Sequence, residues 1–256
     1  MANKPEKPTE NTMEEKEEKE KKESFGLHLD LLMDSMEETR FKKKYSELIE
    51  KLVHETHFND VEVESLLIIY YKLAKENMKT EKYKEKSVTK EQFRDFLHCA
   101  LDMTDDTLMD RIFVSLDRMP GSTITMETYA HALSLMLRGT LEEKINFCFR
   151  VNNAQIRVYD TMGDGLLGRD AMFYLLRNSL VSLSGEDDAE ESVKDMIEVI
   201  TKKLDVDRDG KISFQDYKQT VLKQPALLEV FGQCLPSRGA VYTFSTTFSS
   251  NPNLKM

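Results

Sequence analysis

The segment 205–216 places acidic residues at alternate positions around one glycine. In a calcium loop, positions 1, 3, 5, 7, 9 and 12 supply the oxygens that replace the hydration shell of a hard cation. The candidate ligands here are, in that order, Asp205, Asp207, Asp209, the backbone carbonyl of Lys211, a water held by Ser213, and Asp216. Gly210 at position 6 permits the sharp turn, and apolar Ile212 stands at position 8. The segment therefore predicts a metal-binding loop between two helices, which limits the chain to folds built from such units.

Position 12 is where this loop departs from the common pattern. Glu usually stands there, because its length lets both carboxylate oxygens reach the cation. Asp216 is one methylene shorter, so we expect it to bind through one oxygen unless the following helix moves inward. We therefore expect weaker calcium binding, and poorer discrimination against magnesium, which prefers six ligands.

The pattern around position 8 recurs three times earlier in the chain. In each case an apolar residue precedes a run of apolar residues at helical spacing. The four residues are Val88, Ile124, Leu167 and Ile212, which lie 36, 43 and 45 positions apart. Helix–loop–helix repeats of the EF-hand type have this spacing. The sequence predicts an all-α fold of four EF-hand units in two paired lobes, with short β links between the position-8 residues. The expected units are 58–100, 105–138, 141–180 and 192–223.

Capping residues support this register. Thr89 and Gln92 have the spacing of a capping box at a helix start. Thr140 and Glu143 repeat it at the start of the third unit. Gly139 is expected to end the helix before it.

The units and the composition together predict four segments. Residues 1–24 contain almost no apolar side chains, so the start of the chain is expected to be disordered. Residues 25–36 are more apolar and would dock either on the body or on a partner. Four apolar residues near the end, Leu227, Leu228, Val230 and Phe231, are expected to pack as a further helix. The segments are a charged, largely disordered extension (1–40), an N-terminal pair with degenerate loops (41–138), a C-terminal pair with one intact loop (139–235) and a tail (236–256).

The other three loops have lost ligands. The first, 80–87, offers no alternating carboxylates, and the second keeps one acidic ligand position, Asp117. In the third, Asp160 and Asp164 hold positions 1 and 5, but positions 3 and 12 carry Met162 and Ala171. Asp160 and Asp164 are thus a weak second metal site at most, and we expect that loop mainly to pair with the fourth.

Composition argues against several classes of function. The net charge of −10 argues against nucleic acid as the main ligand, since phosphate contacts need clustered Lys and Arg. The three cysteines, Cys99, Cys148 and Cys234, lack metal spacing and indicate reduced thiols in the cytoplasm. No apolar run could span a bilayer, and Ala2 follows Met1, so we expect neither a membrane anchor nor N-myristoylation.

An enzyme is not expected. No Ser–His–Asp order, phosphate loop or zinc helix motif can be placed in the chain. His54 and His57 would share a helical face, but no carboxylate or Cys completes a convincing metal set in the sequence.

Four runs outside the calcium loops resemble the calaxin family, EF-hand calcium sensors of ciliary and flagellar axonemes that are related to neuronal calcium sensors. The resemblance covers about residues 41–236. The runs are Met103–Phe113, His131–Lys144, Leu176–Leu180 and Phe231–Pro236.

This resemblance implies an elongated, two-lobed helical protein that sits with the outer dynein arm or its docking complex and conveys calcium to ciliary beating. It also implies that the metal ligands are Asp205, Asp207, Asp209, Lys211 and Asp216. The chain departs from the family in its eroded second and third loops, in an apparent seven-residue insertion at 152–158, and in its N-terminal extension. These departures indicate a divergent, calaxin-like paralogue.

Three functions are compatible with the sequence. The first is a calcium-responsive adaptor of the axoneme, which the intact run Asp205–Gly210 favours. The second is a calcium-independent structural scaffold of the axoneme, which the three eroded loops and Asp216 favour. The third is a calcineurin B-like regulatory subunit, which the expected lack of myristoylation weakens.

Overall fold

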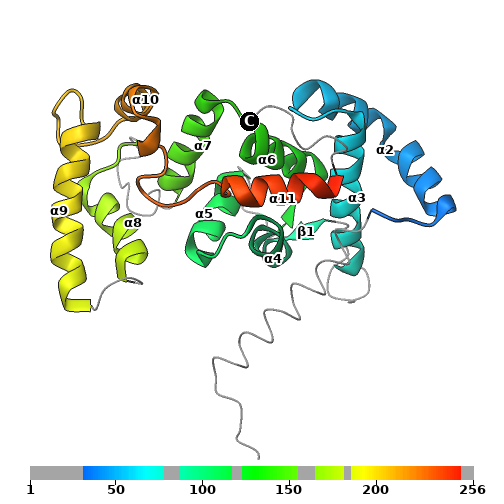
Figure 1. Cartoon of the computed structure of the whole chain (residues 1–256), viewed down its shortest axis with the longest axis horizontal. Helices are drawn as coiled ribbons and strands as arrows, with labels where there is room; N and C mark the ends of the chain where they lie inside the picture. The colour runs from blue at the N-terminus through cyan, green and yellow to red at the C-terminus, as the bar shows by residue number, and fades with distance from the viewer. Residues whose placement is uncertain (1–30, 78–86, 117–122, 155–164, 182–185, 249–256) are drawn as a thin grey trace, which may run out of the picture.

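Helices follow one another along an elongated body, with α2 at one end and α9 at the other (Figure 1). This computed structural model describes residues 31–77, 87–116, 123–154, 165–181 and 186–248. The helices are α2 (Ser35–Glu55), α3 (Asp60–Asn77), α4 (Lys90–Leu101), α5 (Asp106–Leu116), α6 (Met126–Arg138), α7 (Leu141–Ala154), α8 (Arg169–Val181), α9 (Glu186–Leu204), α10 (Phe214–Lys223), the 3-10 turn η2 (Pro225–Leu227) and α11 (Arg238–Phe248). The strands are β1 (Val88–Thr89) and β2 (Thr123–Ile124).

The helices form four helix–loop–helix units, as predicted. The units pair α3 with α4, α5 with α6, α7 with α8, and α9 with α10. The fourth unit begins earlier than expected, because α9 starts at Glu186 rather than near residue 192. The all-α EF-hand fold class is confirmed.

Short β links join the loops within each lobe, at the predicted position-8 residues. Val88 pairs with Ile124 in the antiparallel β1–β2 sheet. Leu167 and Ile212 form an isolated antiparallel bridge, with both N–H···O distances at 3.0 Å. All four side chains are buried, which explains why apolar residues occupy this position in every loop.

The predicted caps are present. Thr89 forms a capping box with Gln92 at the start of α4. At α7 the backbone N–H of Thr140 donates to Glu143 at 2.7 Å, and the N–H of Glu143 donates back to the Thr140 hydroxyl at 3.3 Å. Gly139 ends α6, and a Cβ there would lie 2.4 Å from a backbone oxygen of α6. The close approach at this helix end therefore requires glycine.

The N-terminal lobe includes a helix before the first unit. α2 packs on α3 and α6 and buries Phe41 and Leu52. The expected boundary at residue 40 thus falls inside α2. Of the apolar residues before it, Leu31 and Met33 pack against the core, whereas Leu32 is 80% exposed. The charged stretch 1–30 lies outside the described residues.

The C-terminal segment differs from expectation. Residues 227–231 do not continue as a helix, because the chain passes through η2 into short i→i+3 turns ending at Gly232, which has φ +132°. Phe231 is nevertheless fully buried. Residues 238–248, expected to be part of a tail, form α11, which packs against α3 and α4.

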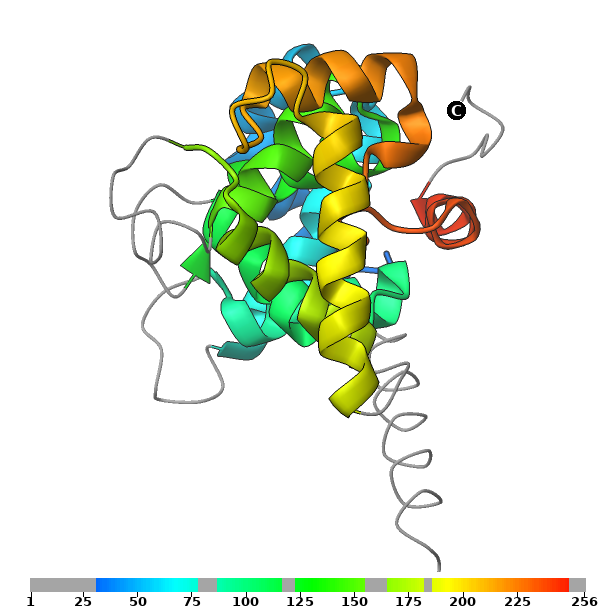
Figure 2. The ribbon, with the colours of Figure 1, turned by 90° about the vertical axis from the view of Figure 1, so that its left-hand side faces the viewer.

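The two lobes share a packed boundary. Helix α5 of the N-terminal pair packs against α7 of the C-terminal pair, and the segment after η2 leads from one lobe to α11 on the other. Viewed from the α9 end of the body, α9 and α8 lie side by side in front and α11 lies to one side (Figure 2). The described part of the apparent insertion, Asn152–Ala154, belongs to α7, whereas residues 155–158 lie outside the described residues.

Candidate metal centre and the segment that follows it

The loop between α9 and α10 gathers three carboxylates. Oxygen atoms of Asp205, Asp207 and Asp209 lie within 4.8 Å of one another. Two residues with positive φ turn the backbone around them, Arg208 at +63° and Gly210 at +85°. The predicted ligands at positions 1, 3 and 5 are therefore together, and such a group of oxygens fits a hard cation.

Backbone N–H groups hold the carboxylates in place. The N–H of Gly210 donates to Asp205 at 2.9 Å, and the N–H of Lys211 donates to Asp209 at 2.7 Å. The N–H of Asp209 is 3.2 Å from a carboxylate oxygen of both Asp205 and Asp207. This N–H contact lowers the pKa of Asp207, but desolvation and repulsion by the neighbouring carboxylates outweigh it, so the pKa is raised. Bringing these negative charges together favours binding of a cation.

Asp216, the predicted position-12 ligand, has a different role in this conformation. It is 6% exposed and forms a capping box with Ser213 at the start of α10. One oxygen accepts from the Ser213 N–H at 3.0 Å and from the Ser213 hydroxyl at 2.5 Å. Asp216 is not part of the three-carboxylate group, so the loop and the helix share one carboxylate between two possible roles.

The loop paired with this one is described only from Gly165 onward. Gly165, at position 6, has φ +68°, as Gly210 has φ +85° at the same position of its own loop. The two loops are joined by the Leu167–Ile212 bridge. Asp160 and Asp164, the weak second candidate, lie outside the described residues, as do most of loop 80–87 and Asp117.

A hydrogen bond connects the residue after Asp216 to the C-terminal segment. Tyr217 is fully buried, and its hydroxyl donates to the backbone carbonyl of Leu228. Burial, and more weakly the neighbouring thiols and Glu229, raise the pKa of Tyr217 well above its usual value. Glu229 then accepts from the N–H of Leu235 at 2.7 Å and folds this segment on itself.

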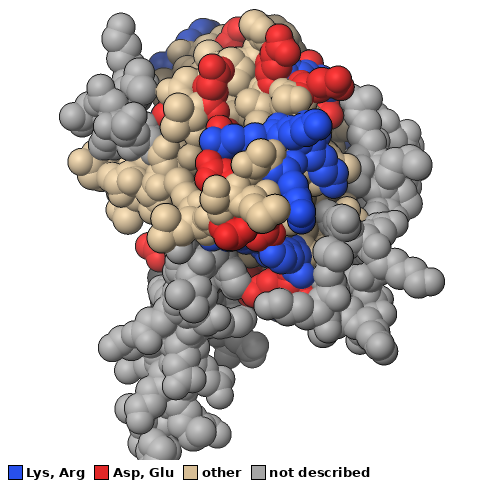
Figure 3. Space-filling view, turned by 90° about the vertical axis from the view of Figure 1, so that its right-hand side faces the viewer, with Lys and Arg blue, Asp and Glu red and all other residues tan. Residues whose placement is uncertain are grey.

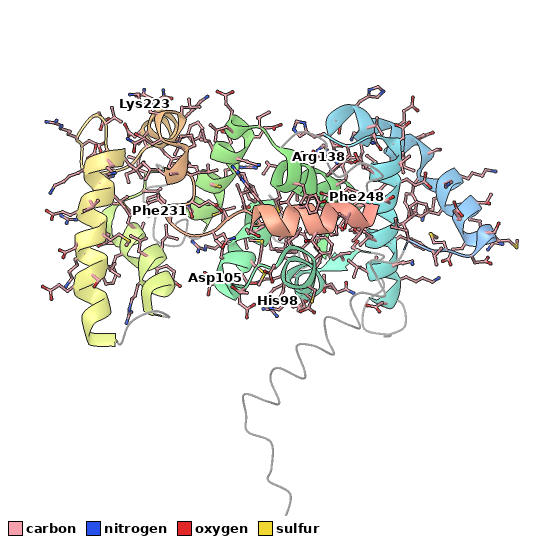
Figure 4. The ribbon with its side chains drawn as sticks, viewed as in Figure 1. His98, Asp105, Arg138, Lys223, Phe231 and Phe248 are labelled. Carbon is pink, nitrogen blue, oxygen red and sulfur yellow. The ribbon has the colours of Figure 1, made fainter. Side chains whose placement is uncertain are left out.

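The segment ends in α11, whose apolar side meets an aromatic face of the N-terminal lobe. Phe244 contacts Phe96 of α4 edge-on with ring centroids 5.5 Å apart, and Phe248 contacts Phe58 at 6.0 Å. Figure 4 labels Phe231 before α11 and Phe248 at its far end. The metal loop is thus connected through Tyr217 and α11 to the opposite lobe.

A buried ion pair lies beside this face. Arg138 donates to both carboxylate oxygens of Glu62 at 2.6 Å, and the two side chains are 16% and 2% exposed. The guanidinium also lies 5.0 Å from the centre of the Phe58 ring. The pair therefore fixes the end of α6 against the start of α3, next to the ring that receives Phe248.

A second acidic group does not form a convincing metal site. Glu55, Glu127 and His131 place ligand atoms within 4.8 Å of one another. The Lys51 ammonium lies 2.7 Å from Glu127, and His131 is 3.2 Å from Glu55. A lysine therefore already supplies positive charge to this group. His57, for its part, contacts Glu143 at 2.9 Å.

The end of the molecule formed by α2 carries a group of basic side chains beside acidic ones. Figure 3 shows Lys and Arg side chains gathered on this face. Arg40, Lys43 and Lys44 of α2 are exposed and make no ion pair with another described residue. In the described part of the chain, no helix combines the length and apolarity needed to cross a membrane.

Reasoning from sequence missed several of these residues. Tyr217 could have been suspected from its place next to position 12, and α11 from the apolar spacing of Val241, Phe244 and Phe248. The Arg138–Glu62 pair carries no comparable local signal, because its members are 76 residues apart.

Comparison with known proteins finds an EF-hand family and several relatives that resemble this chain over most of its length. Residues 142–222 match the family described as EF-hand domain pair. Calaxin of Xenopus laevis is 38% identical over 202 residues, which cover 79% of this chain and 92% of that protein. Calaxin of Homo sapiens is 37% identical over 217 residues, which cover 83% of this chain and 97% of that protein. A recoverin family protein of Dictyostelium discoideum is 27% identical over 207 residues, covering 72% of this chain and 86% of that protein.

Proposed function

This chain belongs to the calaxin family, and we propose that it is a calcium-responsive regulator that acts through a protein partner rather than by catalysis. The proposed setting is the axoneme of cilia or flagella, at the outer dynein arm or its docking complex, because this is what the resemblance to calaxin implies. The observation that carries the calcium response is the group of three carboxylates in the loop 205–216.

The proposed ligands are the side chains of Asp205, Asp207 and Asp209, the carbonyl of Lys211, and Asp216. A bound calcium ion would supply the positive charge that these crowded carboxylates lack. Magnesium is expected to compete, because the short Asp216 side chain favours a site of fewer ligands.

The response would begin at Asp216. The hydrogen bonds to Ser213 use one oxygen of Asp216 and fix the first turn of α10, so drawing Asp216 toward the loop carboxylates would shift that turn. Tyr217 follows directly and is tied to Leu228. A change in the first turn of α10 would therefore move the segment that leads to α11.

The partner would bind where α11 now lies. α11 presents Phe244 and Phe248 at i and i+4 to an aromatic face that includes Phe96 of α4 and Phe58, which lies just before α3. A partner helix with two large apolar side chains at the same spacing would fit that face once α11 leaves it.

Calorimetry tests the calcium response. The full chain is titrated with calcium in millimolar magnesium, beside the variant Asp205→Ala. We expect one site in the wild-type chain and none in the variant. Asp195→Ala is the matched control, because Asp195 is exposed on α9 outside the loop and its removal takes away the same charge. Equal calcium heat from wild-type chain and Asp205→Ala would reject the proposed site.

A calcium-independent scaffold is the second candidate. Asp216 accepts hydrogen bonds within the helix cap, and the Val88–Ile124 link joins two loops whose sequences keep at most one acidic ligand position. If the wild-type chain gives no calcium heat while remaining folded, this second function is preferred.

A further inference from the structure

Two buried thiols meet where the C-terminal segment crosses α7. Cys148 of α7 and Cys234 of the segment after η2 are both fully buried, and the two thiols lie close enough to act on each other electrostatically. The sulfur of Cys234 also lies 3.9 Å from the side-chain oxygen of Asn152. Asn152 follows Cys148 by four residues, which places both on one face of the helix. Cys234 therefore packs on the face of α7 that carries Cys148.

The backbone around Cys234 can adjust. Cys234 follows Gly232, and residues 232–237 belong to neither a helix nor a strand. The two sulfur atoms have to approach to about 2.05 Å, the length of a disulfide bond. An irregular segment can absorb such a shift more easily than two packed helices.

The surroundings of the two thiols differ. Arg111 of α5 is 5% exposed, its Nε and Nη1 atoms have no partner among the described residues, and its charge acts on Cys234. A positive charge beside a sulfur atom favours its reaction as a nucleophile. The contact with Cys234, and burial, raise the pKa of Cys148. The Nη2 atom of Arg111 lies 3.8 Å from the place where a Cβ on Gly232 would stand, so Cys234, on this segment, is taken as the sulfur that attacks.

We propose that Cys148 and Cys234 form an intramolecular disulfide when hydrogen peroxide oxidises the chain. The thiolate of Cys234 attacks one peroxide oxygen, the O–O bond breaks, and a sulfenic acid and hydroxide form. The thiol of Cys148 then attacks that sulfur, the S–O bond breaks, and water leaves with the thiol proton. The two thiols together lose two electrons to the peroxide.

The bond would attach the segment before α11 to α7. Its consequence for signalling rests on the proposed function, because this segment connects Tyr217 to α11. The oxidised chain would keep α11 on α3 and α4 even when α10 changes. Since both thiols are buried, peroxide reaches Cys234 only when the segment opens, so calcium is expected to speed the reaction several-fold if it moves that segment.

Mass spectrometry tests the proposal on the full chain. Reduced protein is treated with hydrogen peroxide, alkylated under denaturing conditions and digested. We expect a cross-linked peptide pair containing Cys148 and Cys234, two hydrogens lighter than the reduced pair. The more exposed Cys99 serves as an internal control for peroxide reactivity. The proposal is overturned if Cys99 is oxidised while Cys148 and Cys234 are still recovered alkylated, or if they link only between molecules.

Variants separate this inference from the proposed function. Cys99→Ala should still form the link, whereas Cys148→Ala and Cys234→Ala should not. A link that forms at the same rate with and without calcium, in a chain that gives no calcium heat, upholds the thiol pair and rejects the calcium response. Calcium heat in a chain that forms no link upholds the calcium response and rejects the thiol pair.

Discussion

At the scale of single residues, Asp216 is the carboxylate for which two roles compete: ligand in the metal loop and cap of α10. Glu in its place would still suit a capping box with Ser213, and its extra methylene would let both oxygens reach a cation. We expect Asp216→Glu to raise calcium affinity by about tenfold and to reduce competition by magnesium. Calorimetry with and without magnesium measures both effects, and equal or weaker calcium binding would contradict this account of position 12.

The Glu62–Arg138 pair makes a prediction about stability. Replacing Arg138 with Met leaves the carboxylate of Glu62, which is 2% exposed, without its cation. Breaking a buried pair in this way costs about 3–5 kcal/mol of unfolding free energy. Urea unfolding measures the loss. Lys42→Met is the control, because Lys42 is 48% exposed and its ion pairs lie at the surface, so we expect a loss of about 0–1 kcal/mol.

Glu229 gives a prediction about pH. Burial raises its pKa above the ordinary 4.5, although N–H groups of Leu235 and Cys234 and the charge of Lys144 oppose this. A carboxyl group with a raised folded pKa favours folding when protonated. Its contribution is therefore present below about pH 4.5 and is lost as pH rises through the folded pKa. We expect Glu229→Gln to remove this dependence, so its stability relative to wild type should increase from pH 4 to pH 7 in urea unfolding.

Single residues also show where sequence reasoning succeeds and where it fails. Asp205, Asp207 and Asp209 were predictable as a group, because a local pattern of twelve residues fixes their positions. The use of Asp216 as a helix cap was not predicted, since the same spacing serves a metal site and a capping box. Contacts such as Arg138–Glu62 and Cys148–Cys234 depend on how distant helices pack.

At the scale of elements, α11 is held by docking rather than by its own helix propensity. Its sequence is rich in Thr and aromatic residues, which are modest helix formers, and Phe244 and Phe248 supply its buried contacts. This explains why the sequence suggested only a tail there. The β links and caps, in contrast, follow from residues close together in the chain and were predicted correctly.

Removing those two rings should uncover the face of α3 and α4. We expect the double variant Phe244→Ala with Phe248→Ala to bind the dye ANS several times more strongly than wild type, because Phe58 and Phe96 lose their aromatic cover. Tyr242→Ala is the matched control, since Tyr242 is 47% exposed on the same helix. If all three chains bind the dye equally, α11 does not shield this face in solution.

At the scale of the whole molecule, the lobes are joined by α5 against α7 and by α11 across the N-terminal lobe. We therefore expect one unfolding transition, with equal calorimetric and van't Hoff enthalpies. Calcium at a hundred times its Kd should stabilise the chain by about 2.7 kcal/mol and shift that single transition upward. Scanning calorimetry with calcium or with a chelator measures this, and two transitions, of which only one responds to calcium, would show that the lobes unfold independently.

The position of α11 also sets the concentration at which a partner helix can bind the face that α11 covers. A helix tethered to the face it covers acts at an effective concentration of about 1 mM. A free helix that binds the bare face equally well would have to reach about the same concentration before it displaced half of α11. In the closed molecule, therefore, only a partner held in place beside it can compete. Any event that detaches these eleven residues makes the face available to a dilute partner.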